Sequence, residues 1–129
     1  DAKFMMSEVL SCIKFNREFM TGPDDIVRDY IHPGDLASLV KFCIAKRDLN
    51  DAFDVISLQP VRKFEILERF LSIYGLKYTV KENYSFSAAT GKKNNYYSTN
   101  KRTNSIGYSP LYTSIDSLIQ ESRAMLDFY

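Results

Sequence analysis

The sequence is short of the residues that most often reveal a reaction centre. It has no tryptophan, one histidine, two cysteines and five scattered glycines in 129 residues. The histidine and the cysteines do not fall at metal-ligand spacing, so no metal site is predicted. The glycines do not form the Gly-x-x-Gly-x-x-Gly turn that holds a dinucleotide phosphate at a helix N-terminus. The chain by itself is therefore predicted to bind neither a metal nor a dinucleotide cofactor.

An excess of one charge and long apolar runs are missing as well. Seventeen basic and sixteen acidic side chains leave a net charge of +1, which is too balanced for a protein dedicated to nucleic acid or to a membrane surface. No apolar run approaches the length that spans a bilayer, and the chain does not open on a signal-peptide pattern. We expect a cytoplasmic protein whose partner is neither nucleic acid nor a membrane.

What is present is the composition of one soluble domain, residues 1–129. With 45% hydrophobic and 26% charged residues, the chain is able to bury a core. Cys12 and Cys43 each fall on or beside the apolar face of a helical pattern, where free thiols are commonly buried. We expect two buried thiols and no disulfide.

Apolar residues recur at helical spacing in four segments, each the stripe of an amphipathic helix: Ala2 to Ile13, Leu36 to Ile44, Val61 to Tyr74, and Ile115 to about Asp127. Pro33-Gly34-Asp35 opens the second helix, Gly75 ends the third, and Thr113 with Asp116 has nearly the spacing of a capping box. Strands are predicted at residues 18–21, 26–31, 52–57 and 77–80. Because helices and strands mix without an internal repeat, the predicted fold class is α/β or α+β.

The segment Val27–His32, which reads Val-Arg-Asp-Tyr-Ile-His, is the most informative part of the sequence. The β-branched residues around Arg28 predict a strand on which Arg28 and Tyr30 face the same side. Both would then line one pocket, where the rigid fork of guanidinium donors suits a diphosphate better than a lysine does. The alternative is a surface strand on which Arg28 pairs with Asp29 or Asp24 and binds nothing.

Residues 81–105 form a long polar segment, rich in asparagine, that does not fit a compact core. Aromatic and basic residues interleave in it: Tyr84, Phe86, Lys92, Lys93, Tyr96, Tyr97, Lys101 and Arg102. Such a mixture binds a nucleotide, a sugar or single-stranded nucleic acid through stacking and charge. The alternative is a solvated loop with a few anchoring tyrosines.

Taken together, these motifs resemble one family. The block from Thr21 to Leu36 is similar to the substrate-side signature of the nucleotide-sugar epimerases and dehydratases, the extended short-chain dehydrogenase/reductases. UDP-galactose 4-epimerases carry Val-Arg-Asp-Tyr-Ile-His unchanged. Phe53–Ser57 stands where the family has a Tyr-Asn-(Leu/Ile)-Gly strand, and Asn100–Thr113 resembles its Ser-Lys-Ala, Leu-Gly-Trp, Pro, Thr series. The resemblance covers essentially all 129 residues, but only the C-terminal, substrate-binding portion of the family's chain.

The resemblance implies roles for particular residues. Arg28 stands at the family position that binds the diphosphate. Phe19, Met20 and Thr21 stand at positions beside the base and ribose, and Tyr30 and Tyr96 are weaker candidates for pocket walls. NAD and the catalytic tyrosine would belong to a Rossmann domain that this sequence lacks, so the chain alone is expected to be inactive and to hold no catalytic residue.

The resemblance also implies what the whole protein does. It would be a homodimeric, NAD-dependent enzyme similar to UDP-glucose 4-epimerase, acting on a UDP-sugar in cell-surface polysaccharide or galactose metabolism. A nucleotide-sugar 4,6-dehydratase or reductase of the same family stays open as an alternative. So does a non-catalytic module that binds a nucleotide or a protein.

Three features depart from the family pattern or imitate a catalytic one. Ala89-Thr90-Gly91-Lys92 replaces the family's Arg-x-Gly-Asp, so the second phosphate arginine is missing, and Lys92 is the candidate for its positive charge. Tyr97 and Lys101 match Tyr-x-x-x-Lys, but no long helical pattern holds them one turn apart, so we interpret the match as accidental. His32 ends a predicted strand without an evident partner, and we do not expect it to act as an acid or base.

Overall fold

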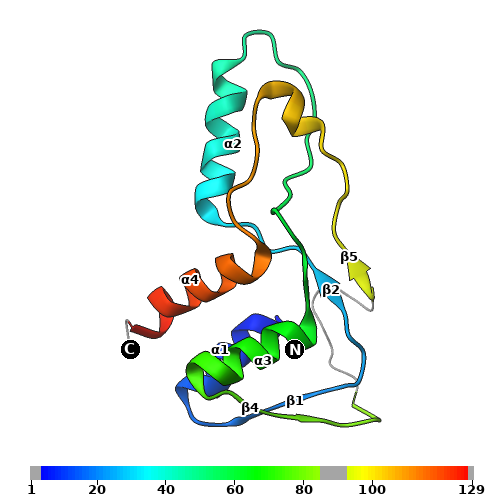
Figure 1. Cartoon of the computed structure of the whole chain (residues 1–129), viewed down its shortest axis with the longest axis vertical. Coiled ribbons are helices and arrows are strands. Elements are labelled where there is room, and N and C mark those ends of the chain that lie inside the picture. Colours follow the sequence, from blue (N-terminus) through cyan, green and yellow to red (C-terminus); the bar gives the residue numbers. More distant parts are fainter. Residues whose placement is uncertain (1–3, 85–92, 128–129) are drawn as a thin grey trace.

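A computed structural model describes residues 4–84 and 93–127 of the chain (Figure 1). The elements follow in the order α1 (Met5–Lys14), β1 (Glu18–Thr21), β2 (Val27–Arg28), α2 (Pro33–Ala45), β3 (Val61–Arg62), α3 (Lys63–Tyr74), β4 (Lys77–Val80), β5 (Asn95–Tyr96), the 3-10 helix η1 (Arg102–Ile106) and α4 (Ser114–Asp127). This mixed α/β organisation confirms the predicted fold class. None of the helices in the described ranges is long and apolar enough to cross a membrane.

All four predicted helices are present, and their ends follow from local chemistry. Pro33 is the first residue of α2, where a missing N–H costs nothing. Gly75 ends α3 with a left-handed φ of 67°, and its N–H donates to the carbonyl of Leu71 at 3.0 Å. Thr113 Oγ1 accepts from the N–H of Asp116 at 3.2 Å and donates to its carboxylate at 2.6 Å, which confirms the predicted cap of α4. Ala2, the first residue of the first stripe, lies outside the described residues.

The strands pair in two small sheets. β1 and β4 form a parallel pair with Glu18 opposite Lys77, and both match the predicted ranges. The second sheet has the order β3-β2-β5, in which β2 is antiparallel to β3 and parallel to β5. The predicted strand 26–31 is reduced to Val27–Arg28, and the predicted strand 52–57 is not formed. No other strand in the described part of the chain pairs with residues 52–57, although their β-branched and aromatic character suits a strand.

Two hydrophobic clusters lie one above the other in Figure 1. The larger is built from α1, β1, β3, α3 and the residue before β4, with half-buried side chains of α4 packed against it. Its buried members are Val9, Cys12, Phe19, Val61, Ile66, Leu67, Phe70 and Leu76. The smaller joins α2 to η1 and consists of Leu39, Ile106 and Tyr108 with half-buried neighbours. The sheet β3-β2-β5 lies beside the junction of the two (Figure 1).

The second predicted stripe differs from the structure. Of its members only Leu39 is buried, whereas Leu36, Val40 and Ile44 are 47%, 48% and 78% exposed. In the described chain, η1, Tyr108 and the segment around Leu49–Val55 pack against α2 in the smaller cluster, which covers one narrow side of the helix. For the same reason Cys43 is only half-buried, while Cys12 is buried as expected, and the two cysteines form no disulfide.

Candidate functional site

Arg28 and Tyr96 are direct partners in the parallel pairing of β2 with β5. The register places both side chains on the same side of the small sheet, and the guanidinium carbon of Arg28 lies 6.0 Å from the centre of the Tyr96 ring. At that distance a cation is attracted by the face of an aromatic ring. Two residues 68 positions apart, both predicted as substrate contacts, are therefore brought together by backbone pairing.

Lys93 adds a second positive charge to the same ring. Its Nζ lies 4.8 Å from the centre of the Tyr96 ring. The sequence suggested Lys92 as the replacement for the family's second phosphate arginine, but Ala89–Lys92 lies outside the described residues, as does Phe86. Among the described residues, Arg28 and Lys93 are the two cations near the Tyr96 ring, so positive charge is clustered at this ring.

Arg28 makes only part of the contacts that its guanidinium allows. Its Nη1 donates to the carbonyl oxygens of Val27 at 2.8 Å and Asn94 at 3.4 Å. Within the described chain it forms no ion pair, so the alternative of pairing with Asp29 or Asp24 is not observed. Asp29 instead accepts from the N–H of Ser57 at 3.1 Å and from Ser114 Oγ at 2.8 Å. None of the described residues accepts a hydrogen bond from Nε or Nη2 of Arg28, and that edge of a guanidinium has the geometry for a bidentate contact with phosphate.

The charge of Arg28 acts on Tyr30, but the side chain of Tyr30 packs against the larger cluster. Its ring is half-buried against that cluster, and its backbone N–H donates to Ser114 Oγ at 2.8 Å. Burial raises the pKa of Tyr30, and the positive charge of Arg28 opposes that rise. The phenol is therefore held in its neutral form at physiological pH, where it is a hydrogen-bond donor and not a base.

The three predicted residues of β1 are placed differently from one another. The side chains of Phe19 and Thr21 are buried, 2% and 4% exposed, whereas Met20 is 39% exposed. Successive side chains of a strand point to opposite faces, so a ligand beside β1 would meet the Met20 side chain and only the backbone of its neighbours. The side chain of Phe19 packs in the core with Leu67 and Phe70, so Phe19 could meet a ligand only through its backbone, and its place beside the base and ribose stays a prediction.

Lys63, the first residue of α3, is a charged residue that the sequence analysis did not single out. Only 5% of it is exposed, and its Nζ donates to the carbonyl of Gly22 at 2.6 Å. Burial lowers the pKa of Lys63, while Asp24 and Asp25 oppose that change. From the sequence, a lysine at a helix N-terminus is expected to be solvated, and the hydrophobic pattern of α3 did not indicate that Lys63 is buried.

Neither of the two apparent catalytic features has catalytic geometry. Tyr97 and Lys101 lie between β5 and η1 in a segment without α-helix, so they are not held one helical turn apart, and our interpretation of the match as accidental stays a prediction. His32 does have partners, contrary to the expectation: it caps α2 by accepting the N–H of Gly34 at 3.0 Å and stacks on Tyr112 with ring centres 3.8 Å apart. His32 is thus buried in a structural contact.

Comparisons with known proteins agree with this fold. No family model matches the sequence, and no curated protein matches it. Among solved structures, MoeE5 in complex with UDP-glucose and NAD has a TM-score of 0.76 at 14% identity, over 97% of this chain and 42% of that one. The UDP-glucuronic acid 4-epimerase of Bacillus cereus, in complex with UDP-glucuronic acid and NAD, has a TM-score of 0.77 at 10% identity, over 98% and 41%.

The same fold also occurs in a protein whose name carries a substrate that is not a nucleotide sugar. A partial consensus L-threonine 3-dehydrogenase has a TM-score of 0.61 at 7% identity, over 96% of this chain and 41% of that one. The chain thus spans about two fifths of the length of each of these structures. The TM-scores show that this chain shares the fold of part of the NAD-dependent UDP-sugar epimerases. Because the identities are this low, the ligand has to be argued from the site.

Proposed function

We propose that residues 1–129 form the nucleotide-sugar-binding part of an NAD-dependent UDP-sugar epimerase, with the diphosphate bound at Arg28. The observation that carries the proposal is the pairing of Arg28 with Tyr96, with Lys93 near the same ring and with no described residue accepting a hydrogen bond from Nε or Nη2 of Arg28. A diphosphate needs clustered positive charge and a bidentate donor, and a base or sugar needs an aromatic or apolar wall. Met20 and Tyr30 are the proposed neighbours of the nucleoside and of the sugar.

The described residues do not fit NAD. A dinucleotide needs a glycine turn before a helix N-terminus so that the backbone can approach the phosphates, and the five glycines of this sequence form no such turn. Hydride transfer is therefore no part of what this chain performs. Its contribution to an epimerase would be to bind the substrate and fix its orientation, which lowers the entropic cost of the reaction. A dimer, a cytoplasmic location and a role in polysaccharide or galactose metabolism stay predictions from the family resemblance.

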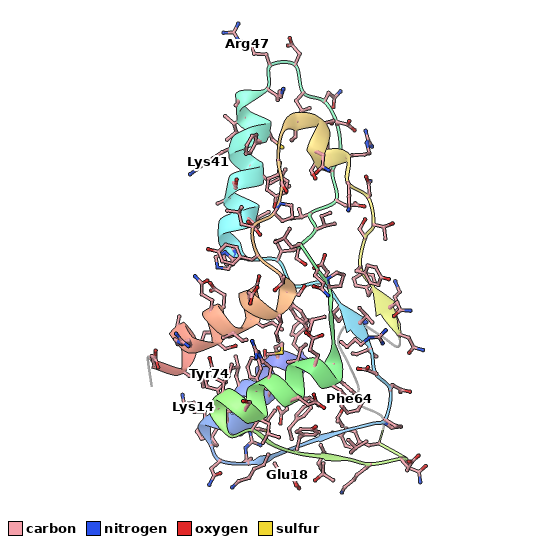
Figure 2. The ribbon with its side chains drawn as sticks, viewed as in Figure 1. Lys14, Glu18, Lys41, Arg47, Phe64 and Tyr74 are labelled. Atoms are coloured by element: carbon pink, nitrogen blue, oxygen red, sulfur yellow. The ribbon has the colours of Figure 1, made fainter. Side chains whose placement is uncertain are left out.

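The proposal is tested by titrating the chain with UDP and UDP-glucose in a calorimeter. Arg28→Ala removes a charge-assisted contact and is expected to weaken binding by about 1.5–3 kcal/mol, roughly tenfold to a hundredfold. Arg47→Ala is the matched control, because Arg47 lies on the turn after α2, at the opposite end of that helix from the segment that follows β2 (Figure 2). Equal affinity of the Arg28→Ala variant and the parent chain would refute the assignment of the diphosphate to Arg28.

A single-stranded nucleic-acid function is the second candidate, because Tyr96 and Tyr97 are 56% and 47% exposed beside Lys93. Exposed aromatic rings next to lysines stack with bases regardless of sequence. That function predicts binding of an oligothymidylate with an affinity that falls steeply with salt. Tight, saturable binding of UDP with no measurable binding of the oligonucleotide at physiological salt would exclude it.

A further inference from the structure

Lys63 holds both ends of the turn that joins β1 to β2. Its backbone N–H donates to the carbonyl of Ile26 at 2.8 Å, immediately before β2. Its side-chain Nζ donates to the carbonyl of Gly22 at 2.6 Å, immediately after β1. One residue at the start of α3 therefore spans residues 22–26 with two hydrogen bonds, one from the main chain and one from the ammonium group.

The neighbours of Lys63 reinforce the same contact. The N–H of Phe64 donates to Asp25 Oδ1 at 3.1 Å, and Arg62 Nη1 lies 3.6 Å from Asp25 Oδ2. Arg62, the residue that precedes the helix, provides no side-chain cap of its own, so the carboxylate of the turn satisfies one of the free N–H groups at the start of α3. Phe64 marks this end of α3 in Figure 2, close to the strand that carries Arg28. The turn and the helix start thus fix each other.

An ammonium group in this place has an energetic cost that an apolar side chain would avoid. Lys63 is 5% exposed, and a buried charge is costly unless it is paired and hydrogen-bonded. Its Nζ lies 4.3 Å from the centre of the Phe64 ring, and Asp24 and Asp25 act on it electrostatically from the turn. Such partners offset part of the desolvation. What the ammonium group adds over a methionine of similar length is its bond to Gly22.

We propose that Lys63 is a positioning residue of the nucleotide site, which sets the end of β1 in place relative to Arg28 on β2. The inference rests on the proposed function, because β1 and β2 are the two strands that would meet the nucleoside and the diphosphate. Arg28 on β2 lies opposite Val61 on β3, and Val61 is only two residues before Lys63. The bond from the ammonium group of Lys63 to Gly22 therefore connects the end of β3 to the backbone that follows Thr21 on β1. Lys63 acts through the geometry of the turn and has no need to touch the ligand.

The test compares Lys63→Met with Ile66→Val, a control on the same helix whose side chain is 1% exposed in the core. UDP affinity is measured by calorimetry and stability by urea unfolding. Lys63→Met is expected to bind UDP roughly tenfold more weakly, the equivalent of one charge-assisted bond. It should also lose stability to urea, because the carbonyl of Gly22 is left without its donor. Ile66→Val should lose stability and keep its affinity.

A second readout separates positioning from packing. Lys63→Arg keeps a charged donor at all accessible pH values, because guanidinium does not lose its proton in proteins. The parent chain should lose UDP affinity as Lys63 deprotonates below the ordinary lysine pKa of 10.5, whereas Lys63→Arg should lose less over the same range. Asp24 and Asp25 on the turn and Arg62 beside them are unchanged in both proteins. If Lys63→Met does not fold, Lys63→Gln is measured in its place, and because its neutral and shorter donor bonds Gly22 more weakly than the ammonium group does, a smaller loss of affinity is expected.

The outcomes distinguish the inference from the function on which it rests. Loss of affinity in both Arg28→Ala and Lys63→Met, with Ile66→Val unaffected, supports both. Loss in Arg28→Ala with parental affinity in the uncharged Lys63 variants overturns the positioning role and leaves the binding site standing. Parental affinity in Arg28→Ala overturns the proposed function itself.

Discussion

At the scale of single residues, two aspartates organise the junction on which Arg28 depends. Asp35 is 1% exposed, and its carboxylate accepts the N–H groups of Leu111 at 3.0 Å and Tyr112 at 3.1 Å. Asp29 accepts from Ser57 and Ser114 in the same manner. A buried carboxylate that accepts several N–H and O–H donors is satisfied without a cation. Neither aspartate therefore competes for Arg28.

Tyr108 gives a prediction of pH dependence at this scale. It is 1% exposed, and its hydroxyl has no hydrogen-bond partner in the described chain. Burial raises the pKa of Tyr108, and the negative charge of Asp35 raises it further. A phenol whose pKa is higher in the folded state contributes stability below its ordinary pKa of 10.0, and that contribution is lost as the pH rises through the folded-state value.

Tyr108→Phe is therefore expected to leave the free energy of unfolding within about 1 kcal/mol of the parent at pH 7 and to reduce its decline above pH 10. Urea unfolding of both proteins at pH 7.5 and pH 10.5 measures the difference. Tyr97→Phe, which changes an exposed ring, is the control. An alkaline decline of the same size in Tyr108→Phe and the parent would contradict the assignment of that decline to Tyr108.

At the scale of elements, the two ends of α3 are determined in different ways: one by local sequence and the other by tertiary contacts. Its end is local: Gly75 adopts a left-handed conformation that closes the helix. Its start is tertiary, since Asp25 and Ile26 from the preceding turn accept the first N–H groups. Only the end was predicted from sequence, because a glycine after an apolar stripe is a local signal, whereas a capping carboxylate 39 residues away is not.

Gly75→Ala tests the local end. A Cβ added at Gly75 would meet no heavy atom within 4 Å, so the positive φ of 67° is the only cost. That strain is expected to lower the free energy of unfolding by about 1–2 kcal/mol, measured by urea unfolding. Ser72→Ala, an exposed position on the same helix, should change it by less than about 0.5 kcal/mol. A Gly75→Ala variant as stable as the parent would show that the helix end is not held in this conformation.

At the scale of the whole molecule, the chain has two unequal clusters and one incompletely covered helix. The larger cluster is enclosed by three helices and the β1–β4 pair, while the smaller one rests on α2 and η1 (Figure 1). Leu39 is the residue of α2 that the smaller cluster buries, and Val40 beside it is 48% exposed. The apolar stripe of α2 is therefore wider than the surface that covers it.

The adjacent pair Leu39 and Val40 tests this asymmetry. Leu39→Ala is expected to lower the free energy of unfolding by about 2–4 kcal/mol, because it removes buried methyl groups and leaves a cavity. Val40→Ala should cost less than about 1 kcal/mol, because half of its surface is already in water. Urea unfolding compares the two variants. Equal losses would mean that α2 is buried on both sides in solution.

How much of the candidate site could be predicted differs from residue to residue. Arg28, Tyr30 and Tyr96 came from the sequence, and the structure places Tyr96 opposite Arg28. Phe19 was assigned to the site from the family resemblance alone, and the alternation of side chains along β1 places its side chain in the core. Lys63 and Lys93 gained their places only through contacts with distant segments, Gly22 in one case and Tyr96 in the other.

The sequence by itself determined what depends on neighbours along the chain. The four helices, their caps at Thr113 and Gly75, and the ranges of β1 and β4 follow from periodicity and local hydrogen bonding. The tertiary structure alone decided which stripe is covered, whether residues 52–57 find a strand partner, and which cations share the ring of Tyr96. Burial and strand pairing require a partner surface, and the residues that supply it are far apart in sequence, so no local pattern specifies them.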